Sequence, residues 1–599
     1  MPRLPRPTPR EPRVARLARL RAALVGAAGL FHVACAPGHA PFPLRAPVLR
    51  DQDLDAVRVA CVRRPDHGDL RHVSCAPAPS DVPQIWTPLD HMVFRPISDT
   101  FSVRVSGEAA NVNSLDEVPD SAWFTNRGAA TGIATSTCDP SRILDPTRSA
   151  DGTWVIDRGK TTGATPGFRV TVPKRGKYMF KADTPDQPEV PTAASVVGAA
   201  IYRAAGFNTA CEQIVYFPPS LLKLSPGLRY RHSVAEDPKP FDERALQHVL
   251  DGAARRGPLV RMHASAWIPG YLLGPFRYDG TRSDDPSDVI PHEDRRDLRG
   301  ARLIAAWIDH VDARDANSMD AWVAEGAVPD GSPGHVVHYY PDTSDAFGPD
   351  FGPILTPRMG FSYTLDWSDM AEDLLTLGVL RRPWFAGAGD PGFSVFRGFD
   401  VHSFVPSEWK MQYENPAFSR MTERDGAWMA RILARFSREQ VRALAQMAEL
   451  TDPKNTEHLE TVLEGRLERI LARYLTRLAP IGELHVEARD RLCGLDLAQM
   501  RAVREPASFR FTARWSPGAA SPDDGRRARG LRVEASGAGR VCVDLPRVAP
   551  DAGPRDDSPQ RYVTVHVDDG VAQGPLVAYL YDLGPARGYV LAGIDRPEG

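Results

Sequence analysis

The sequence is poor in lysine, in closely spaced cysteines and in long apolar runs. Only eight of its 73 Lys and Arg residues are Lys, so each lysine stands out. The net charge of −3 gives no basic excess, and we therefore expect no nucleic-acid partner. The seven cysteines show no Cys-x-x-Cys spacing, which argues against a zinc site. The apolar run at residues 22–31 is shorter than the roughly 20 residues that a membrane-spanning helix needs.

What the sequence does contain is typical of a large globular protein. Hydrophobic residues make up 42% of the chain and charged residues 25%. A chain of 599 residues is too long for a single core, so two or three domains are expected. The 55 prolines and 48 glycines indicate many loops and long connections.

The N-terminal segment, residues 1–35, predicts export. An Arg-rich stretch precedes the apolar run, and small residues then lead to Cys35. This ending resembles the processing site of bacterial lipoproteins, which implies that Cys35 is acylated and anchors the protein to a membrane of the cell envelope. The alternatives are an ordinary secretory signal and an Arg/Pro-rich tail on a cytosolic protein. Residues 36–96 are Pro-rich, and we interpret them as a tether with loops.

The remaining cysteines indicate disulfides. Six are left without Cys35, and an even number permits complete pairing in an exported protein. Cys61 and Cys75 flank a short loop, and we predict that they pair with each other.

The stretch 291–342 holds the strongest candidate site. Apolar residues at three- and four-residue spacing over 298–308 predict a helix with one buried face. The helix runs into a polar loop that carries Asp312 and, five residues later, Asn317. Asp342 then follows an apolar run that predicts a strand.

A Gly-rich turn with its flanking strands lies upstream. The turn contains Gly163 and Gly167, and alternating apolar residues predict strands at 168–172 and 178–181. The second strand ends at Lys181. Glycines let backbone N–H groups approach phosphate and a lysine neutralises it, so Gly163, Gly167 and Lys181 are candidates for cofactor binding.

These motifs resemble the protein-kinase-like superfamily, in particular HipA-type bacterial kinases and phosphatidylinositol kinases. In that family an Asp-x-x-x-x-Asn motif is followed by a metal-binding Asp at the end of a strand. The resemblance implies that Asp312 is the catalytic base and that Asn317 and Asp342 hold Mg²⁺. It implies that Lys181 binds the phosphates of ATP.

The same resemblance implies the fold class: α+β, with an N-terminal segment and small β-rich lobe at 97–260 and a helical large lobe at 261–485. One feature departs from the family. The helix predicted at 192–205 should carry a Glu that pairs with Lys181, but Ser195 stands at that position.

The chain also resembles a group of lipid-anchored proteins from myxobacteria and their relatives, for which no activity is established. This resemblance rests on DEVPDSAWFTNR at 116–127, TRSDDPSDVIPHEDRRDLRG at 281–300 and NPAFSRMTERD at 415–425. We interpret the first segment as an irregular loop held in place by Trp123 and Phe124.

The C-terminal part has a different pattern. Apolar residues alternate with period two from residue 505 onwards, which predicts a β-sandwich over 505–599. Before it, the sequence predicts a long amphipathic helix over 459–478 and a capping box of Ser437 and Gln440.

Three functions fit these residues. The first is an exported phosphotransferase that uses Mg²⁺ and ATP on an unknown protein or small-molecule substrate. The second is a catalytically inactive kinase-like scaffold or binding lipoprotein of the envelope, which the departure at Ser195 favours. The third is a metal-dependent hydrolase, although no His-Glu-x-x-His-like spacing supports it. Its ligands would be Asp309, His310, Asp312, His335 and His338.

Overall fold

The computed structural model describes residues 41–44, 51–63, 73–80, 83, 86–101, 107–127, 138–146, 152–160, 165–230, 237–326, 331–340, 342–348, 356–386, 391–518, 529–548 and 555–598. The chain divides into Met1–Pro41 and a compact unit, Phe42–Gly599, which contains every described helix and strand. Cys35 and Gly163 lie outside the described residues, so both stay predictions. No helix in these ranges is long and apolar enough to cross a bilayer.

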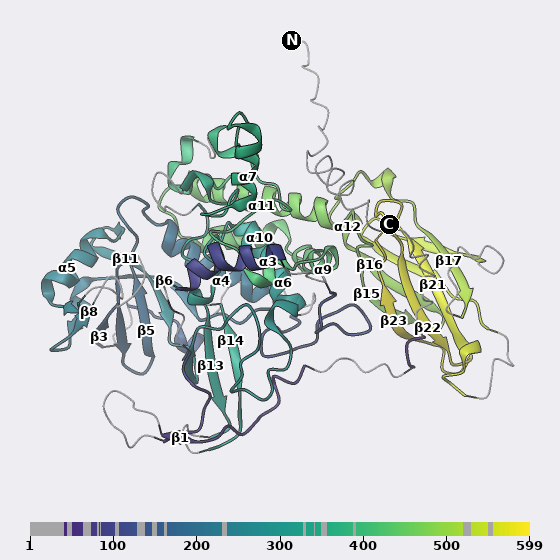
Figure 1. The fold of residues 1–599 in the computed structure, drawn as a ribbon, viewed down its shortest axis with the longest axis horizontal. Helices are drawn as coiled ribbons and strands as arrows, with labels where there is room; N and C mark the ends of the chain where they lie inside the picture. Colours follow the sequence, from purple (N-terminus) through teal and green to yellow (C-terminus); the bar gives the residue numbers. More distant parts are fainter. Residues whose placement is uncertain are drawn as a thin grey trace, which may run out of the picture. The chain divides into compact units, whose positions relative to one another are not determined.

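The structure is a mixed α+β fold with several sheets, and its first β region is a seven-stranded sheet (Figure 1). The strand order is β10-β11-β5-β4-β3-β7, and β6 also pairs with β11. All pairings are antiparallel except β3–β7. The strands predicted at 168–172 and 178–181 are confirmed. The bounds are β3 (Trp154–Gly159), β4 (Gly167–Val172), β5 (Gly176–Lys181), β6 (Glu212–Phe217), β7 (Leu222–Leu224), β10 (Arg255–Arg256) and β11 (Leu259–Ala266).

This sheet has a hydrophobic core of its own. Trp154, Phe168 and Phe180 are fully buried in it, and they share it with the apolar face of α5 (Glu243–Gly252). Alternation of buried and half-buried residues along β4 and β5 explains why the period-two pattern identified these strands.

A separate and larger core is helical. Helix α6 (Arg296–Ile308) is buried along almost its whole length, and α9 (Glu423–Leu433) and α11 (Pro453–Tyr474) pack against it. The buried helix predicted at 298–308 is therefore confirmed, and a 3-10 turn, η5 (His292–Asp294), precedes it. The other helices of this core are α4 (Val190–Ala205), α8 (Pro416–Ser419), α10 (Arg438–Met447) and α12 (Leu497–Met500). The predicted capping box before α10 is also confirmed.

A three-stranded antiparallel sheet, β12-β13-β14, leads to the candidate site. Its strands are Tyr271–Gly274, Met319–Ala324 and Gly334–Tyr339. Residues 36–96, predicted to be a tether with loops, contain short regular elements. They include β1 (Val62–Arg63), β2 (Val73–Ser74), α2 (Trp86–Leu89), a π-helix, η1 (Asp90–Phe94), and the start of α3 (Arg95–Phe101). Two further short strands, β8 (Arg229–Tyr230) and β9 (Lys239–Pro240), pair with each other.

The C-terminal part consists of two antiparallel sheets that share one hydrophobic core. One has the order β15-β16-β20-β19 and the other β18-β17-β21-β22-β23. The strands begin at Ile481, before the predicted boundary at 505, because β15 and β16 join the first sheet. The bounds are β15 (Ile481–Glu487), β16 (Arg491–Asp496), β17 (Thr512–Pro517), β18 (Arg529–Leu531), β19 (Val533–Ala535), β20 (Arg540–Asp544), β21 (Tyr562–Asp568), β22 (Leu576–Asp582) and β23 (Tyr589–Asp595).

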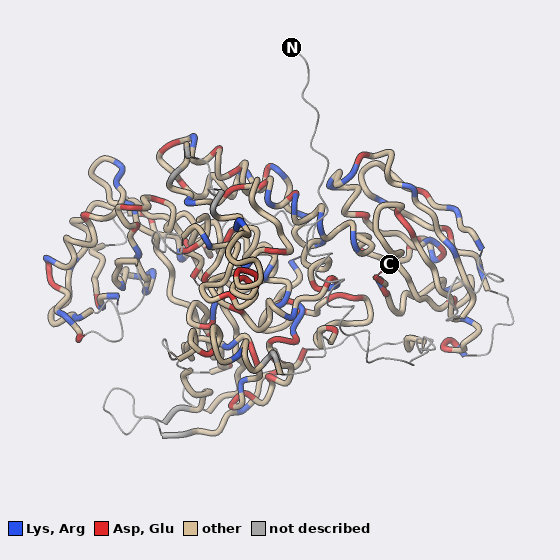
Figure 2. The backbone as a smooth tube through the Cα atoms, turned by 45° about the horizontal axis from the view of Figure 1, so that its top comes forward, with Lys and Arg blue, Asp and Glu red and all other residues tan. Residues whose placement is uncertain are grey.

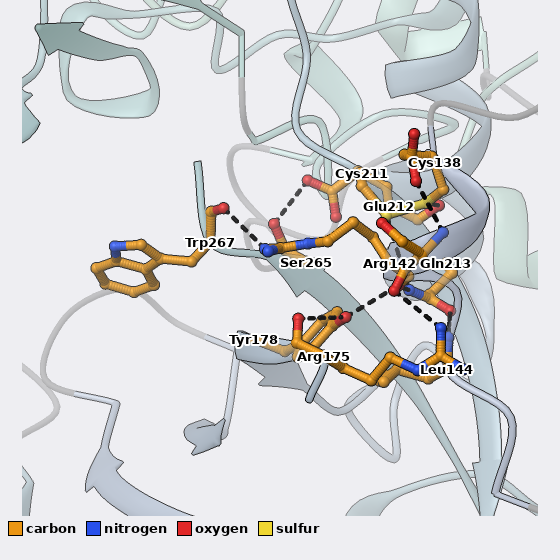
Figure 3. Close-up of a disulfide and its surroundings, with 12 residues drawn as sticks. Cys138, Arg142, Leu144, Arg175, Tyr178, Cys211, Glu212, Gln213, Ser265 and Trp267 are labelled. Carbon is orange, nitrogen blue, oxygen red and sulfur yellow. Dashed lines mark hydrogen bonds between the residues drawn. A yellow bond between two sulfur atoms is a disulfide. The ribbon is translucent and has the colours of Figure 1, made fainter. Parts of the chain in front are cut away.

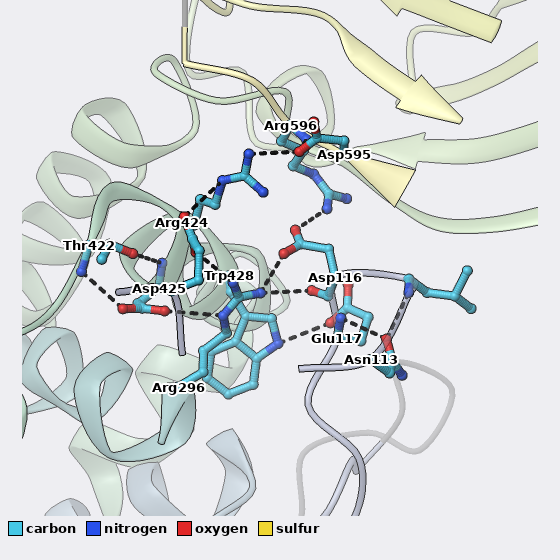
Figure 4. A network of polar contacts seen from close by, with 12 residues as sticks. Asn113, Asp116, Glu117, Arg296, Thr422, Arg424, Asp425, Trp428, Asp595 and Arg596 are labelled. Carbon is cyan, nitrogen blue, oxygen red and sulfur yellow. Dashed lines mark hydrogen bonds and ion pairs between the residues drawn. The ribbon is translucent and has the colours of Figure 1, made fainter. Parts of the chain in front are cut away.

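Charges of both signs are interspersed along the described chain (Figure 2), and several groups of them are buried, one of which surrounds Asp116. The Asp116 carboxylate accepts from Arg296 Nη1 at 2.5 Å and pairs with Arg596 (Figure 4). It also lies 3.5 Å from Arg431 Nη2. Burial alone would raise the pKa of Asp116, but these three guanidinium groups hold it well below its usual range. The network joins the segment 107–127 to α6, α9 and the residue after β23.

The same segment is anchored by apolar packing. Trp123 and Phe124 are almost completely buried, and Phe124 forms a β-bridge with Phe207. The interpretation of 116–127 as an irregular loop held by these two aromatic residues is confirmed.

We predict that Asp116→Ala lowers the free energy of unfolding by about 3–5 kcal/mol, because it leaves Arg296 and Arg596 buried without their shared carboxylate. The matched control is Asp556→Ala, which removes an exposed ion pair with Arg587 and should have little effect. Denaturant-induced unfolding measures the free energy of unfolding of both variants. Equal stability of the two would contradict the structural role of Asp116.

Candidate functional site

A cavity of about 460 Å³ lies between the seven-stranded sheet and the loop that follows α6. We call it the sheet–loop cavity. Of the described residues that line it, five are cationic and one is anionic. The charged lining residues are Arg158, Lys160, Arg169, Lys181, Arg314 and Asp342. The lining also includes Asn317, so three of the predicted site residues meet in this one place.

Lys181 and Asp342 form a direct ion pair. Lys181 is the last residue of β5, Asp342 follows β14, and Lys181 Nζ lies 2.7 Å from Asp342 Oδ2 although 161 residues separate them. Burial alone would raise the pKa of Asp342, but Lys181 and a hydrogen bond from Ser344 hold it well below its usual range. The Asp342 side chain keeps 31% of its surface exposed, so it can still accept a further ligand.

Asp312 and Asn317 are bound to each other. Asn317 Nδ2 donates to Asp312 Oδ2 and to the Asp312 carbonyl oxygen, both at 2.8 Å. Arg314 Nε lies 2.8 Å from the other carboxylate oxygen of Asp312. Burial raises the pKa of Asp312 to about 7, despite the nearby Arg314. Asn317 and Arg314 thus face the sheet–loop cavity, and Asp312 lies directly behind them.

Two further titratable groups support the Asp312 loop from behind. Asp345 Oδ2 accepts from the Asp312 backbone N–H at 2.8 Å, and Asp345 Oδ1 lies 3.3 Å from His310 Nε2. Burial raises the pKa of Asp345 to about 8 and lowers that of His310 to about 4. Sequence reasoning did not select Asp345 as a site residue. Its hydrogen bond to the Asp312 backbone gave no sequence signal.

Helix α4 contacts the Asp342 loop without supplying an acid. A Cβ at Gly198 would lie 2.5 Å from Thr343 Oγ1, and that hydroxyl donates to the Ala194 carbonyl at 3.0 Å. Ser195, where the kinase-like pattern has Glu, donates back to the Pro191 carbonyl within α4. The packing that positions Asp342 is therefore present, but the predicted partner of Lys181 on this helix is not.

The two acids nearest to α4 in the sequence have other partners. Glu189 accepts from the backbone N–H and hydroxyl of Thr451. Glu212 accepts from Ser265 Oγ at 2.8 Å and pairs with His263.

Gly167 has a steric reason to be glycine. It is the first residue of β4, and a Cβ there would lie 2.2 Å from the Phe180 carbonyl oxygen on β5. The close approach keeps β4 in register with β5 and so places Lys181. The phosphate-binding role of Gly167 stays a prediction.

A second ammonium group lies in the sheet–loop cavity. Lys160 Nζ donates to the carbonyl and hydroxyl oxygens of Thr165 at 2.6 and 2.7 Å. Burial, together with the positive charge of Lys181, lowers the pKa of Lys160 to about 7. Sequence reasoning did not select this lysine.

A disulfide braces one wall of the cavity (Figure 3). Cys138 pairs with Cys211, which brings the segment 138–146 against β5 and β6. Arg142 then donates to the carbonyl oxygen of Trp267, a lining residue, at 3.1 Å, and its own carbonyl accepts from Tyr178 at 2.9 Å. The position of the Trp267 backbone therefore depends on this segment.

The described residues contain two more disulfides. Cys61–Cys75 confirms the predicted pair, and Cys493–Cys542 joins β16 to β20.

Four of the five ligands considered for a metal-dependent hydrolase, all but His335, have partners outside that set. Asp309 accepts from Trp409 Nε1 at 2.8 Å, and His338 Nδ1 lies 2.6 Å from Asp320 Oδ1. Among the described residues, just one group of three His, Cys, Asp or Glu side chains has ligand atoms within 4.8 Å of one another. That group is Glu487, Cys493 and Cys542, and its two cysteines form a disulfide.

Comparison with known proteins identifies no relative: no protein-family model, no curated protein and no solved structure matches this chain.

We predict that Gly167→Ala destabilises the protein by about 1–3 kcal/mol, because the new methyl group would collide with the Phe180 carbonyl. The control is Gly530→Ala on β18, where a Cβ meets no atom within 4 Å. Thermal unfolding should show a lower midpoint for Gly167→Ala. For Gly530→Ala, the free energy of unfolding should change by less than about 0.5 kcal/mol. A tolerated Gly167→Ala would remove the steric explanation.

Proposed function

We propose that this chain is an exported, atypical kinase-like phosphotransferase that binds ATP with Mg²⁺ in the sheet–loop cavity. One observation carries the proposal: Lys181, Asn317 and Asp342 come from three distant segments and line a single cavity, with Asp312 directly behind it. A β-rich region with its own core and a helical region with another lie on the two sides of this cavity, in keeping with two kinase-like lobes.

The charge and shape of the cavity suit a nucleoside triphosphate. Its cationic excess favours a polyanion. Lys181 provides an ammonium group on the sheet, and Lys160, with a pKa of about 7, adds a second that is about half protonated at neutral pH. Apolar side chains line another part of the wall and suit a flat aromatic base. They are Met179, Trp267, Ile268, Leu272 and Met319.

The oxygen donors suit Mg²⁺. The Asp342 carboxylate is exposed in part, and the Asn317 amide directs its Nδ2 to Asp312, which leaves its oxygen for a cation. A bound Mg²⁺ would neutralise phosphate charge. Asp312, with a pKa of about 7, is suited to take the proton of an acceptor hydroxyl at neutral pH.

The three disulfides support the predicted export, because such bonds persist in oxidising compartments. We therefore place the proposed activity at the cell envelope, with Cys35 as the anchor. The acceptor would be a protein or small molecule at that location.

A catalytically inactive scaffold is the second candidate, and one observation favours it. With Ser195 in place of the expected acid, Lys181 pairs with Asp342 itself, so Mg²⁺ and Lys181 compete for the same carboxylate. A scaffold of this kind would bind nucleotide weakly, or would bind it without transferring a phosphoryl group.

The first test is ligand-induced stabilisation. Saturating Mg-ATP, at about a hundred times its Kd, should stabilise the protein by about 2.7 kcal/mol. Lys181→Ala and Asp342→Asn should reduce this shift, and Lys223→Ala, an exposed residue on β7, should not. No shift in the unmutated protein would eliminate nucleotide binding and with it the phosphotransferase.

The second test separates transfer from binding. Since Asp312 must be deprotonated to act as a base, the phosphorylation rate should rise with pH through about 7. Asp312→Asn should lower kcat by about 10²–10⁴-fold while the stabilisation by Mg-ATP persists. Stabilisation by Mg-ATP without any transfer, in both proteins, would identify the inactive scaffold.

A further inference from the structure

Helix α7 (Trp367–Thr376) and the turn after it expose a cluster of large apolar side chains. We call residues 374–380 the α7 tip. The exposed fractions are 76% for Leu374, 81% for Leu375, 87% for Leu377 and 81% for Val379. A single exposed leucine needs no explanation, but four such side chains within six positions mark an interaction site.

The backbone of the tip is strained at one of these residues. Leu377 has φ 52° and ψ 34°, and Gly378 follows with φ +72°, so two consecutive residues are left-handed. Glycine or asparagine would adopt the first conformation with less strain than leucine. The Leu377 side chain is also the most exposed of the four, so packing within the chain does not compensate for the strain. The left-handed pair closes the C-terminus of α7, since the Gly378 N–H donates to the Asp373 carbonyl oxygen at 2.9 Å, so the choice of leucine here is what lacks a structural reason.

Charges of both signs lie beside the tip and roughly balance. Arg382 pairs with Asp369, Glu372 and Asp373, the three acids of α7, at 3.1, 2.9 and 2.6 Å. Arg382 offsets one of these three negative charges. Arg381 and Arg358, whose guanidinium carbon lies 5.4 Å from the Trp384 ring centroid, bring the positive charges of this region to three. Exposed Arg381 directly follows the tip.

An aromatic residue completes the flank of the tip. The Trp384 ring centroid lies 5.8 Å from the Arg382 guanidinium carbon. Apolar side chains next to an arginine and a tryptophan are the combination found at the interface of a lipid bilayer.

We propose that the α7 tip inserts its apolar side chains into the surface of a membrane, with Arg381 among anionic headgroups. A second copy of the chain is a poorer occupant, because stable interfaces take roughly 20–30 residues from each partner and the tip has far fewer. The proposal is independent of nucleotide binding. Acylation at Cys35 would bring a bilayer within reach, and the tip would then add a second membrane contact.

The direct test places a fluorophore on the tip. In the full chain with Cys35→Ser, which excludes acylation, Leu377→Cys is labelled with an environment-sensitive dye. Vesicles of phosphatidylglycerol and phosphatidylcholine should shift the emission to the blue and raise its intensity about twofold or more. The same dye at Lys223→Cys, on exposed β7, should not respond.

A second measurement uses unlabelled protein. Vesicle co-sedimentation of the Cys35→Ser chain should fall about tenfold when Leu374, Leu375 and Val379 are changed to Ser and Leu377 to Gly. The thermal unfolding midpoint of this variant should stay unchanged or rise, because Leu377→Gly relieves the strain of the left-handed backbone at position 377. Residues 1–34 are present in both proteins, so any binding by them cancels in the comparison.

Two outcomes would overturn the proposal. One is vesicle binding without a response of the dye at position 377, which would place the membrane contact elsewhere. The other is a blue shift that depends on protein concentration in the absence of vesicles, which would identify a second copy as the occupant.

Discussion

The fold depends on charges that are buried around one carboxylate. Asp116 compensates guanidinium groups that come from α6, α9 and the C-terminal end of the chain (Figure 4). Arg296 is the first residue of α6, and the candidate site begins just beyond the last. The two ends of one helix therefore serve different purposes: the first fixes the helix against three other segments, and the second presents the Asp312 loop to the cavity.

The parts of the site that the sequence predicted were those with a local pattern. The 3.6-residue period of α6 and the alternation along β5 identified the elements that carry Asp312, Asn317 and Lys181. Lys181 and Asp342 also form an ion pair of 2.7 Å. The sequence placed both in one site only through the order of motifs along the chain, because no local pattern determines a contact between residues 161 positions apart.

The parts that sequence reasoning missed are polar and long-range. Asp345, Lys160 and Asp116 act through contacts with backbone groups or charges far away in the chain, and such residues follow no period. The early start of the C-terminal sheets was missed for a related reason. Charged residues and glycines interrupt the apolar alternation in β15 and β16, whose place in the sheet is decided by pairing with β20.

The disulfide between Cys138 and Cys211 affects the cellular compartment in which the cavity is stable. The covalent ring that it closes contains β3, β4, β5 and α4, and thus both lysines of the cavity and the helix that packs on the Asp342 loop. A ring of 73 residues reduces the conformational freedom of the unfolded segment by the equivalent of about 4 kcal/mol. In a reducing compartment that contribution disappears, so this half of the cavity is most stable after the chain has reached an oxidising environment.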